Sequence, residues 1–240
     1  MPIQTLQTFT DAIHATSETS DLWDVMIRFM SGRGVRMASF HTVSGMRPVE
    51  PLIQAHGFPE DWVRHYVAAD LIRFDPIVAL AAKRTKPFLW SDVANLTRLG
   101  PDEAAFLRDL ETAAVGDGLA MQVYGPNARS AYVGLGFGGP APHLSGPEVF
   151  ELKSAAQIGY LRYCELTDHR HALERDLSPR EEEILGWIAR GKSNGVIADI
   201  LGVSRHTVDT NVRRIFEKLE VSDRTTAALR GIGVGIVAVD

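Results

Sequence analysis

Cysteine is nearly absent from this chain, because Cys164 is the only one among 240 residues. A single cysteine excludes an intramolecular disulfide framework and a cysteine-rich zinc site. No apolar run approaches the roughly 18 residues that a membrane-spanning helix needs. The N-terminus also lacks the basic and apolar segments of a secretory signal. We therefore expect a cytoplasmic protein with no membrane partner.

A strong excess of charge of one sign is also lacking. The chain carries 25 basic and 30 acidic residues, a net charge of −5, which argues weakly against a surface covered by nucleic acid. From Leu177 to Asp240 nine basic residues balance nine acidic ones, so this segment remains compatible with a local DNA-binding face. Apolar residues make up 45% of the chain, which is ordinary for a globular protein.

A polar stretch divides the chain. We interpret residues 167–176 as a linker, helical at its start, between a domain at 1–166 and a smaller one at 177–240. In the first domain, apolar spacing predicts helices and strands in mixed order. The helices are expected at 5–16, 20–31, 59–70, 76–83, 102–114 and 144–165, and the strands at 35–43, 119–124 and 131–137. This order predicts an α+β fold, with an N-terminal α/β/α sandwich around a central antiparallel sheet.

The C-terminal domain begins with a strong helix signal. Ser178 is suited to cap a helix that has Pro179 at its first position and Glu181 placed to return a capping bond. Further helices are predicted at 194–201 and from 205 to about 219, and an apolar segment closes the chain at 225–237. Gly202 stands where the chain turns sharply and a positive φ is favoured. We predict an all-α, four-helix domain of the helix-turn-helix type.

The second helix of this motif would present polar and basic side chains to DNA, with its N-terminus favourable for phosphate. Arginines suit phosphate contact or bidentate reading of guanine. The alternative is a small helical bundle whose charges are merely solvated. The candidate DNA-binding residues are Lys192, Asn194, Ser204, Arg205, His206, Thr207, Thr210, Asn211, Arg213 and Arg214.

This segment resembles the LuxR-type helix-turn-helix over residues 176–230. The resemblance rests on Leu177-Ser178-Pro179-Arg180-Glu181, Gly191-Lys192-Ser193-Asn194, Ile197-Ala198, Val203-Ser204, Thr207-Val208 and Lys218-Leu219. Asn211 departs from it, because many members have histidine there. Members usually bind double-stranded DNA as dimers, so the resemblance implies a homodimer, with the segment at 225–237 as a place to pair.

The first domain is not expected to be a receiver domain that is phosphorylated on aspartate. Such a domain needs an acceptor aspartate and a lysine where this chain has Ala55 and Ala105. Instead, Trp62, Tyr66, Asp75 and Trp90 are suited to form an apolar pocket with a few convergent polar groups. The alternative for the aromatic residues is ordinary core packing. For Asp75, which precedes Pro76, the alternative is a plain helix cap.

Together these residues resemble the autoinducer-binding domain of LuxR-type quorum-sensing receptors. The pattern is Trp62-x3-Tyr66-x8-Asp75-Pro76, then Pro87-Phe88-x-Trp90, then Gly118 opening a strand. The resemblance implies an N-acyl-homoserine lactone as ligand, with Trp62 bonding the lactone carbonyl and Asp75 accepting the amide N–H. Tyr66 and Trp90 would line the pocket, and Gly118 would allow close backbone packing.

Two positions depart from the pattern on the acyl side. Phe58 stands where several members have a tyrosine, and Gly134 stands where many have serine or threonine. Phenylalanine donates no hydrogen bond, and glycine is expected to remove a polar contact and open space. These departures lead to the hypothesis of a long or unusual acyl group.

The sequence thus predicts a quorum-sensing transcriptional regulator. The alternative is a LuxR-type regulator that responds to a different small molecule or acts without ligand. An enzyme is not expected, because Gly-x-Ser-x-Gly and His-Glu-x-x-His motifs are lacking. His169 and His171 form only a weak metal pattern, so we predict no catalytic residues, metal or cofactor.

Overall fold

The computed structural model describes residues 5–43, 52–126, 129–173, 177–233 and 236–237. The chain divides into two compact units. The larger unit contains most residues up to Leu166, and the smaller unit contains those from Thr167 onward. No helix within these ranges has the length and apolarity needed to cross a membrane.

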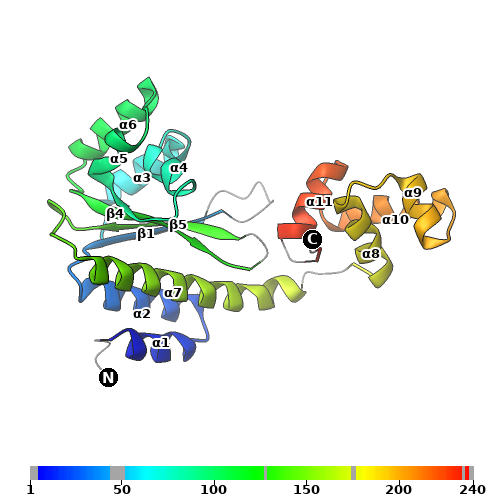
Figure 1. The fold of residues 1–240 in the computed structure, drawn as a ribbon, viewed down its shortest axis with the longest axis horizontal. Helices are drawn as coiled ribbons and strands as arrows, with labels where there is room; N and C mark the ends of the chain where they lie inside the picture. The colour runs from blue at the N-terminus through cyan, green and yellow to red at the C-terminus, as the bar shows by residue number, and fades with distance from the viewer. Residues whose placement is uncertain (1–4, 44–51, 127–128, 174–176, 234–235, 238–240) are drawn as a thin grey trace. The chain divides into compact units, whose positions relative to one another are not determined.

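A five-stranded sheet forms the centre of the larger unit (Figure 1). Its strands are β1 (Met37–Val43), β2 (Leu52–His56), β3 (Phe88–Leu89), β4 (Gly118–Tyr124) and β5 (Ser130–Gly136), in the order β2-β1-β5-β4-β3. The pairs β1–β2, β3–β4 and β4–β5 are antiparallel. The three predicted strands and the α/β/α sandwich are confirmed, whereas β2 and β3 were not predicted.

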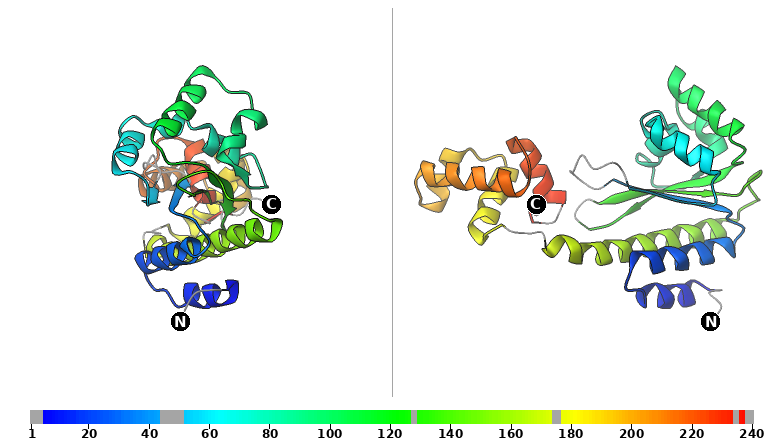
Figure 2. Two further views of the ribbon diagram at one scale, coloured as in Figure 1. Left: turned by 90° about the vertical axis from the view of Figure 1, so that its left-hand side faces the viewer. Right: turned by 180° about the vertical axis from the view of Figure 1, so that it is seen from behind.

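Helices α2 (Thr19–Ser31) and α7 (Gly146–Leu173) cover one face of the sheet, and α1 (Leu6–His14) packs on the outer side of this layer (Figures 1 and 2). Alternate strand residues such as Phe40, Met121 and Val133 are buried in this layer with the fully buried Phe9 and Phe29. The burial of these large side chains provides the main apolar driving force for folding. The helix predicted to end at 165 continues to Leu173 and so enters the predicted linker.

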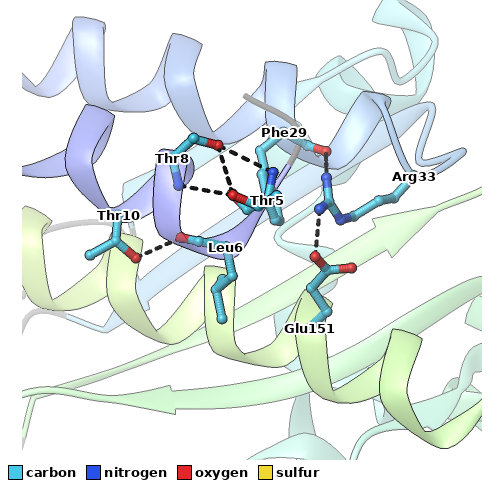
Figure 3. A network of polar contacts seen from close by, with 7 residues as sticks. All are labelled: Thr5, Leu6, Thr8, Thr10, Phe29, Arg33 and Glu151. Carbon is cyan, nitrogen blue, oxygen red and sulfur yellow. Dashed lines mark hydrogen bonds and ion pairs between the residues drawn. The ribbon is translucent and has the colours of Figure 1, made fainter. Parts of the chain in front are cut away.

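A polar contact links two helices of this layer (Figure 3). The Arg33 guanidinium donates to the Phe29 carbonyl oxygen at 3.1 Å and to the Glu151 carboxylate of α7 at 2.5 Å. It also lies over the Phe29 ring, 3.4 Å from the ring centre. The end of α2 is therefore fixed against the long helix α7. In the same region Thr5 caps α1 by accepting from the Thr8 amide.

The opposite face of the sheet carries shorter helices. They are α3 (Glu60–Ala68), α4 (Pro76–Ala81), α5 (Val93–Leu96) and α6 (Pro101–Thr112), with the 3-10 turns η1 (Leu71–Arg73) and η2 (Trp90–Asp92). A second core forms here, in which Ala120 and Tyr132 of the sheet meet Trp62, Trp90 and Phe106. Because β-strand side chains alternate between faces, the sheet separates this second core from the first one.

The smaller unit consists of α8 (Pro179–Ala189), α9 (Asn194–Leu201), α10 (Arg205–Lys218) and α11 (Arg224–Gly233), the four helices predicted. Ser178 and Glu181 form the predicted capping box. Gly202 ends α9 in the left-handed conformation with a φ of 63°, and Ser204 caps α10 by accepting from the Thr207 amide. Helix caps and turn thus set the path from α9 to α10 as the sequence predicts.

A tight turn before β4 positions the segment that carries Trp90. Asp117 exchanges backbone hydrogen bonds with Gly139 and Phe137, and its carboxylate accepts from the amide and hydroxyl of Ser91. Gly116 makes this turn with a φ of +71°, and a Cβ there would lie 2.2 Å from the Gly139 nitrogen. Only glycine fits both the conformation and the close approach.

We therefore expect Gly116→Ala to lower the unfolding free energy by about 2 kcal/mol or more, since it adds left-handed strain and a backbone clash. Gly139→Ala is the matched control, because a Cβ there meets nothing within 4 Å. Thermal and urea unfolding of both variants test this expectation. Equal stability of the two variants would contradict it.

Candidate functional site

A cavity lies between the sheet and the helices of the aromatic face. It opens beside α3, where the lining residue Val67 is 56% exposed. The predicted residues Phe58, Trp62, Tyr66, Asp75 and Trp90 all line it. The other lining residues are Ser39, His41, Ile53, Ala55, Val63, Val67, Ile77, Phe106, Leu110 and Tyr132. The structure therefore brings the predicted aromatic residues and the aspartate together around one space.

Asp75 is the acidic group of this cavity and is 6% exposed. Its Oδ1 accepts hydrogen bonds from the amides of Ile77 at 2.8 Å and Val78 at 3.2 Å, so Asp75 caps α4. Its Oδ2 accepts from the Tyr66 hydroxyl at 2.9 Å. An ionised carboxylate offers about four acceptor positions. Three are filled by these bonds, which leaves Oδ2 able to accept one more donor from the cavity.

Burial is the main influence on the charge of this pair. It raises the pKa of Asp75 to about 6, against the hydrogen bonds from Tyr66, Val78 and Ile77, which lower it. Burial and the neighbouring Asp75 charge raise the pKa of Tyr66 far above its usual range. Tyr66 therefore stays protonated, and its hydroxyl donates a hydrogen bond to Asp75. The Asp75 carboxylate is ionised only above mildly acidic pH.

Trp90 forms another part of the wall, and its place depends on glycine. A Cβ on Gly118 would lie 2.5 Å from the Trp90 ring, so the absence of a side chain there lets the indole pack against β4. The buried Trp90 Nε1–H approaches the Tyr132 hydroxyl without reaching hydrogen-bond geometry, and it has no partner among the described residues. Phe58 stacks near the same indole, with ring centres 6.4 Å apart.

The space expected at Gly134 is already filled, which corrects the prediction for this position. A Cβ on Gly134 would lie 2.6 Å from the Tyr132 hydroxyl oxygen and 2.9 Å from the Ser39 hydroxyl oxygen. Two other hydroxyl groups thus occupy the place that a side chain at 134 would take. Pro76 does not line the cavity either; it is buried at the first position of α4, behind Asp75.

The sequence analysis missed the polar residues of the sheet wall, above all Ser39, His41 and Tyr132. A signal for them was present, because Ser39 and His41 alternate with Ala38 and Phe40 within a strand that is buried on both faces. Polar residues at alternate positions of such a strand lie together on one side of the sheet. A polar wall facing an aromatic helix layer could therefore have been expected.

In the smaller unit, the candidate DNA-binding residues lie on α9 and α10, apart from Lys192 before α9 and Ser204, which caps α10. Most of them are exposed, namely Lys192, Ser204, Arg205, His206, Thr207, Arg213 and Arg214, whereas Asn194, Thr210 and Asn211 are half-buried. The Asn194 amide donates to Asp209 of α10 at 2.7 Å and accepts from Arg224 of α11 at 2.8 Å. Asn194 thus ties three helices together. The Asn211 amide donates to the Thr207 carbonyl oxygen at 2.8 Å.

Among the described residues, no group of three or more histidine, cysteine, aspartate or glutamate side chains is placed to hold a metal ion. The side chains of His169 and His171 lie outside the described residues.

Two family models match the chain. The autoinducer binding domain matches residues 18–163, and the bacterial regulatory proteins of the luxR family match residues 175–230. The transcriptional activator protein BjaR1 of Bradyrhizobium diazoefficiens is 26% identical, over 75% of this chain and 74% of that protein. The HTH-type quorum-sensing regulator RhlR of Pseudomonas aeruginosa is 28% identical, over 82% of this chain and 80% of that protein.

Solved structures agree with the fold. The crystal structure of Escherichia coli SdiA is 18% identical, with a TM-score of 0.76 over 96% of this chain and 97% of SdiA. A structure of SdiA in complex with octanoyl-rac-glycerol gives a TM-score of 0.77 over 98% of this chain and 96% of that one. At this identity the likeness shows the fold alone.

The raised pKa of Asp75 predicts a pH dependence of stability. The folded form holds the proton up to about pH 6, against an ordinary value of 3.8, so the folded form binds more protons than the unfolded one between these values. The Asp75 contribution to unfolding free energy is therefore greatest below pH 3.8 and is lost as pH rises through 6. We expect the stability of the wild-type chain relative to Asp75→Asn to fall by about 2–3 kcal/mol over this range.

Urea unfolding of both proteins from about pH 4 to about pH 7.5 measures this difference. The Asp75→Asn variant is a suitable reference, because asparagine also caps helices but does not titrate. A stability difference between the two proteins that stays constant or grows with pH would show that the folded structure does not raise the pKa of Asp75.

Proposed function

Because the chain belongs to the LuxR-type quorum-sensing transcriptional regulators, we propose that it binds an N-acyl-homoserine lactone and, as a dimer, controls transcription from specific DNA sites. The family consists of transcriptional regulators and not of enzymes. The autoinducer-binding part would sense the ligand, and the helix-turn-helix part would bind double-stranded DNA. The compartment that holds this DNA, the cytoplasm, is the proposed place of action.

The free acceptor position on Asp75 is the observation that carries the ligand proposal. Its Oδ2 accepts from Tyr66 and has room for one further donor on the cavity side. The amide N–H of an acyl-homoserine lactone is such a donor. A charged acceptor in a buried site makes a stronger hydrogen bond than a neutral one. A hydrogen bond from the ligand would also favour the ionised carboxylate, and so oppose the effect of burial, which raises the pKa of Asp75.

The aromatic residues suit the rest of the ligand. Trp62 and Trp90 both line the cavity, and their indole N–H groups are donors for carbonyl oxygens of the lactone and the acyl group. The Trp90 N–H in particular is buried and lacks a partner among the described residues. Phe58, Val63 and Val67 add apolar surface that leads toward solvent, which supports a long acyl group.

The four-helix unit supports the DNA part of the proposal. Arg213 and Arg214 are exposed on α10, which would be the recognition helix of the helix-turn-helix. Leu229 of α11 is 48% exposed, within the apolar segment expected to pair in a dimer. Such a dimer would present two recognition helices about 34 Å apart. Ligand would change DNA affinity only by binding the DNA-competent and incompetent forms unequally.

A second candidate is a regulator of this family whose ligand is not a lactone, or one that needs no ligand. The structure of SdiA in complex with octanoyl-rac-glycerol supports it, because that protein of like fold binds an acyl ester. Phe58 also supports it, since it offers no hydroxyl to an acyl carbonyl. A monoacylglycerol therefore belongs in any ligand panel.

Thermal melting against lactones of increasing chain length tests the ligand. Binding to the folded form raises the melting temperature, and each buried methylene adds about 0.8 kcal/mol, or roughly fourfold in Kd. We expect a rise that grows with chain length until the cavity is full. Asp75→Asn should reduce the rise by losing the charged acceptor. No shift with any lactone, but a shift with octanoylglycerol, would favour the second candidate.

Substitution of Arg213 and Arg214 by alanine tests DNA binding. Each lost phosphate contact lowers the salt dependence of log K by about one, so we expect weaker binding and a shallower salt slope on random-sequence duplex DNA. Arg190→Ala removes an exposed arginine at the end of α8 and serves as the charge-matched control. The two arginines are substituted one at a time, and identical salt slopes for Arg213→Ala, Arg214→Ala and Arg190→Ala would place the DNA-binding face elsewhere.

A further inference from the structure

An acidic residue lies in the first half of α10, among exposed basic ones. Asp209 comes one helical turn after Arg205 and one turn before Arg213, so the three side chains lie along one side of the helix. Both arginines are exposed, and Asp209 is half-buried. A negative charge on this side opposes the approach of DNA phosphates. Asp209 therefore cannot serve as a phosphate contact, and its place beside the arginines needs another explanation.

The Asp209 carboxylate is held in a defined orientation by two neighbouring helices. Its Oδ1 accepts from the side-chain amide of Asn194, at the start of α9, at 2.7 Å. The Asn194 amide oxygen accepts in turn from the Arg224 guanidinium of α11 at 2.8 Å. The same guanidinium donates to the Lys192 backbone carbonyl oxygen. Both ends of the Asn194 amide are thus engaged, so this amide is fixed and in turn fixes the carboxylate.

The second oxygen of Asp209 is not used by the protein. Oδ2 has no hydrogen bond among the described residues, and the carboxylate forms no ion pair there with Arg205 or Arg213. An ionised carboxylate has about four acceptor positions, and it cannot donate. Only one of these positions is filled, by Asn194. The structure therefore leaves an oriented, charged acceptor beside two exposed arginines.

The edges of the DNA bases differ in how well they match such an acceptor. In the major groove, guanine presents two acceptors and thymine presents an acceptor and a methyl group. Adenine presents an amino group next to an acceptor, whereas cytosine presents its N4 amino group alone. A carboxylate is attracted by the amino groups and repelled by the acceptors. Cytosine is therefore the base that an oriented aspartate favours most.

We propose that Asp209 reads a cytosine in the DNA site by accepting a hydrogen bond from the N4 amino group. Asn194 and Arg224 are positioning residues for this contact, which gives Asn194 a role behind the interface with DNA. The inference rests on the proposed function, because it requires α10 to enter the major groove. The carboxylate weakens binding to most sequences and weakens it least where a cytosine meets it, so it contributes specificity by rejecting other sites.

Selection from a pool of duplexes with a random central segment tests this reading, using the full-length chain. For the wild type we expect a two-fold symmetric motif with a cytosine at one fixed position in each half. Asp209→Asn keeps an oxygen for the Asn194 amide but turns the free acceptor into an N–H donor. In its motif the cytosine should be replaced by a base with an acceptor, guanine or thymine. Asp209→Ala should show no preference at this position.

Fluorescence titration with single duplexes measures the size of the effect. For the wild type, replacing the cytosine pair in the selected duplex should weaken binding about 10-fold, as one mismatched pair typically does. For Asp209→Ala this ratio should come close to one. Asp209→Ala should also bind random-sequence duplex more tightly than the wild type, because a charge that repels phosphate is removed. A merely structural role for Asp209 predicts the opposite, weaker binding to every duplex.

Two further variants separate positioning from general charge effects. Asn194→Ala releases the carboxylate, so it should reduce the preference at the cytosine pair and leave the rest of the motif unchanged. Asp199→Asn is the matched control, because it removes an exposed acidic charge from α9 instead of α10 and should leave the whole motif unchanged. If Asn194→Ala does not melt cooperatively, the two Asp209 variants decide the matter by themselves.

The negative results have different meanings. An unchanged motif in both Asp209→Asn and Asp209→Ala overturns this inference alone and leaves Asp209 as a structural link between α9 and α10. A wild-type chain that selects no motif, with or without a lactone that raises its melting temperature, contradicts the proposed function and this inference together.

Discussion

The buried carboxylate of Asp75 is the group on which the aromatic half of the larger unit depends. One oxygen caps α4 through the amides of Ile77 and Val78, and the other accepts the Tyr66 hydroxyl from α3. A charge away from water is tolerated only where hydrogen bonds replace its hydration. The residues that stabilise this carboxylate are therefore the same ones that set the distance between two helices and the shape of the cavity.

The sheet keeps this demanding site apart from the residues that stabilise the fold. On one face Phe9, Ile13 and Phe29 are fully buried among other apolar side chains. On the other face polar groups such as His41 and Asp75 are buried around a cavity. Functional sites are where folded chains depart from the rules of good packing. Because the cavity and its buried polar groups lie on one face of the sheet, the apolar core on the opposite face can stabilise the fold whether or not a ligand is bound.

Much of this arrangement was predictable, because caps and periodic apolar residues are local signals. The helices, three strands and the turn at Gly202 follow from them. Strand β2 was missed because none of its residues from Ile53 to His56 is fully buried, and β3 has just two residues. Helix α7 runs on to Leu173 because nothing between 167 and 173 breaks a helix. The crowding at Gly134 was not predictable, since it depends on where the Tyr132 side chain points in three dimensions.

That crowding makes residues 132 and 134 interdependent in evolution. While Tyr132 lies across Gly134, any side chain gained at 134 collides with its hydroxyl at 2.6 Å. Shortening the tyrosine first removes the closest of these contacts and leaves the Ser39 hydroxyl, 2.9 Å away, as the remaining one, so the order of the two substitutions affects how much each one costs. Contacting residues commonly show such non-additive effects. A laboratory selection for new ligands at this wall is therefore expected to find substitutions at 134 more readily once position 132 carries a smaller side chain.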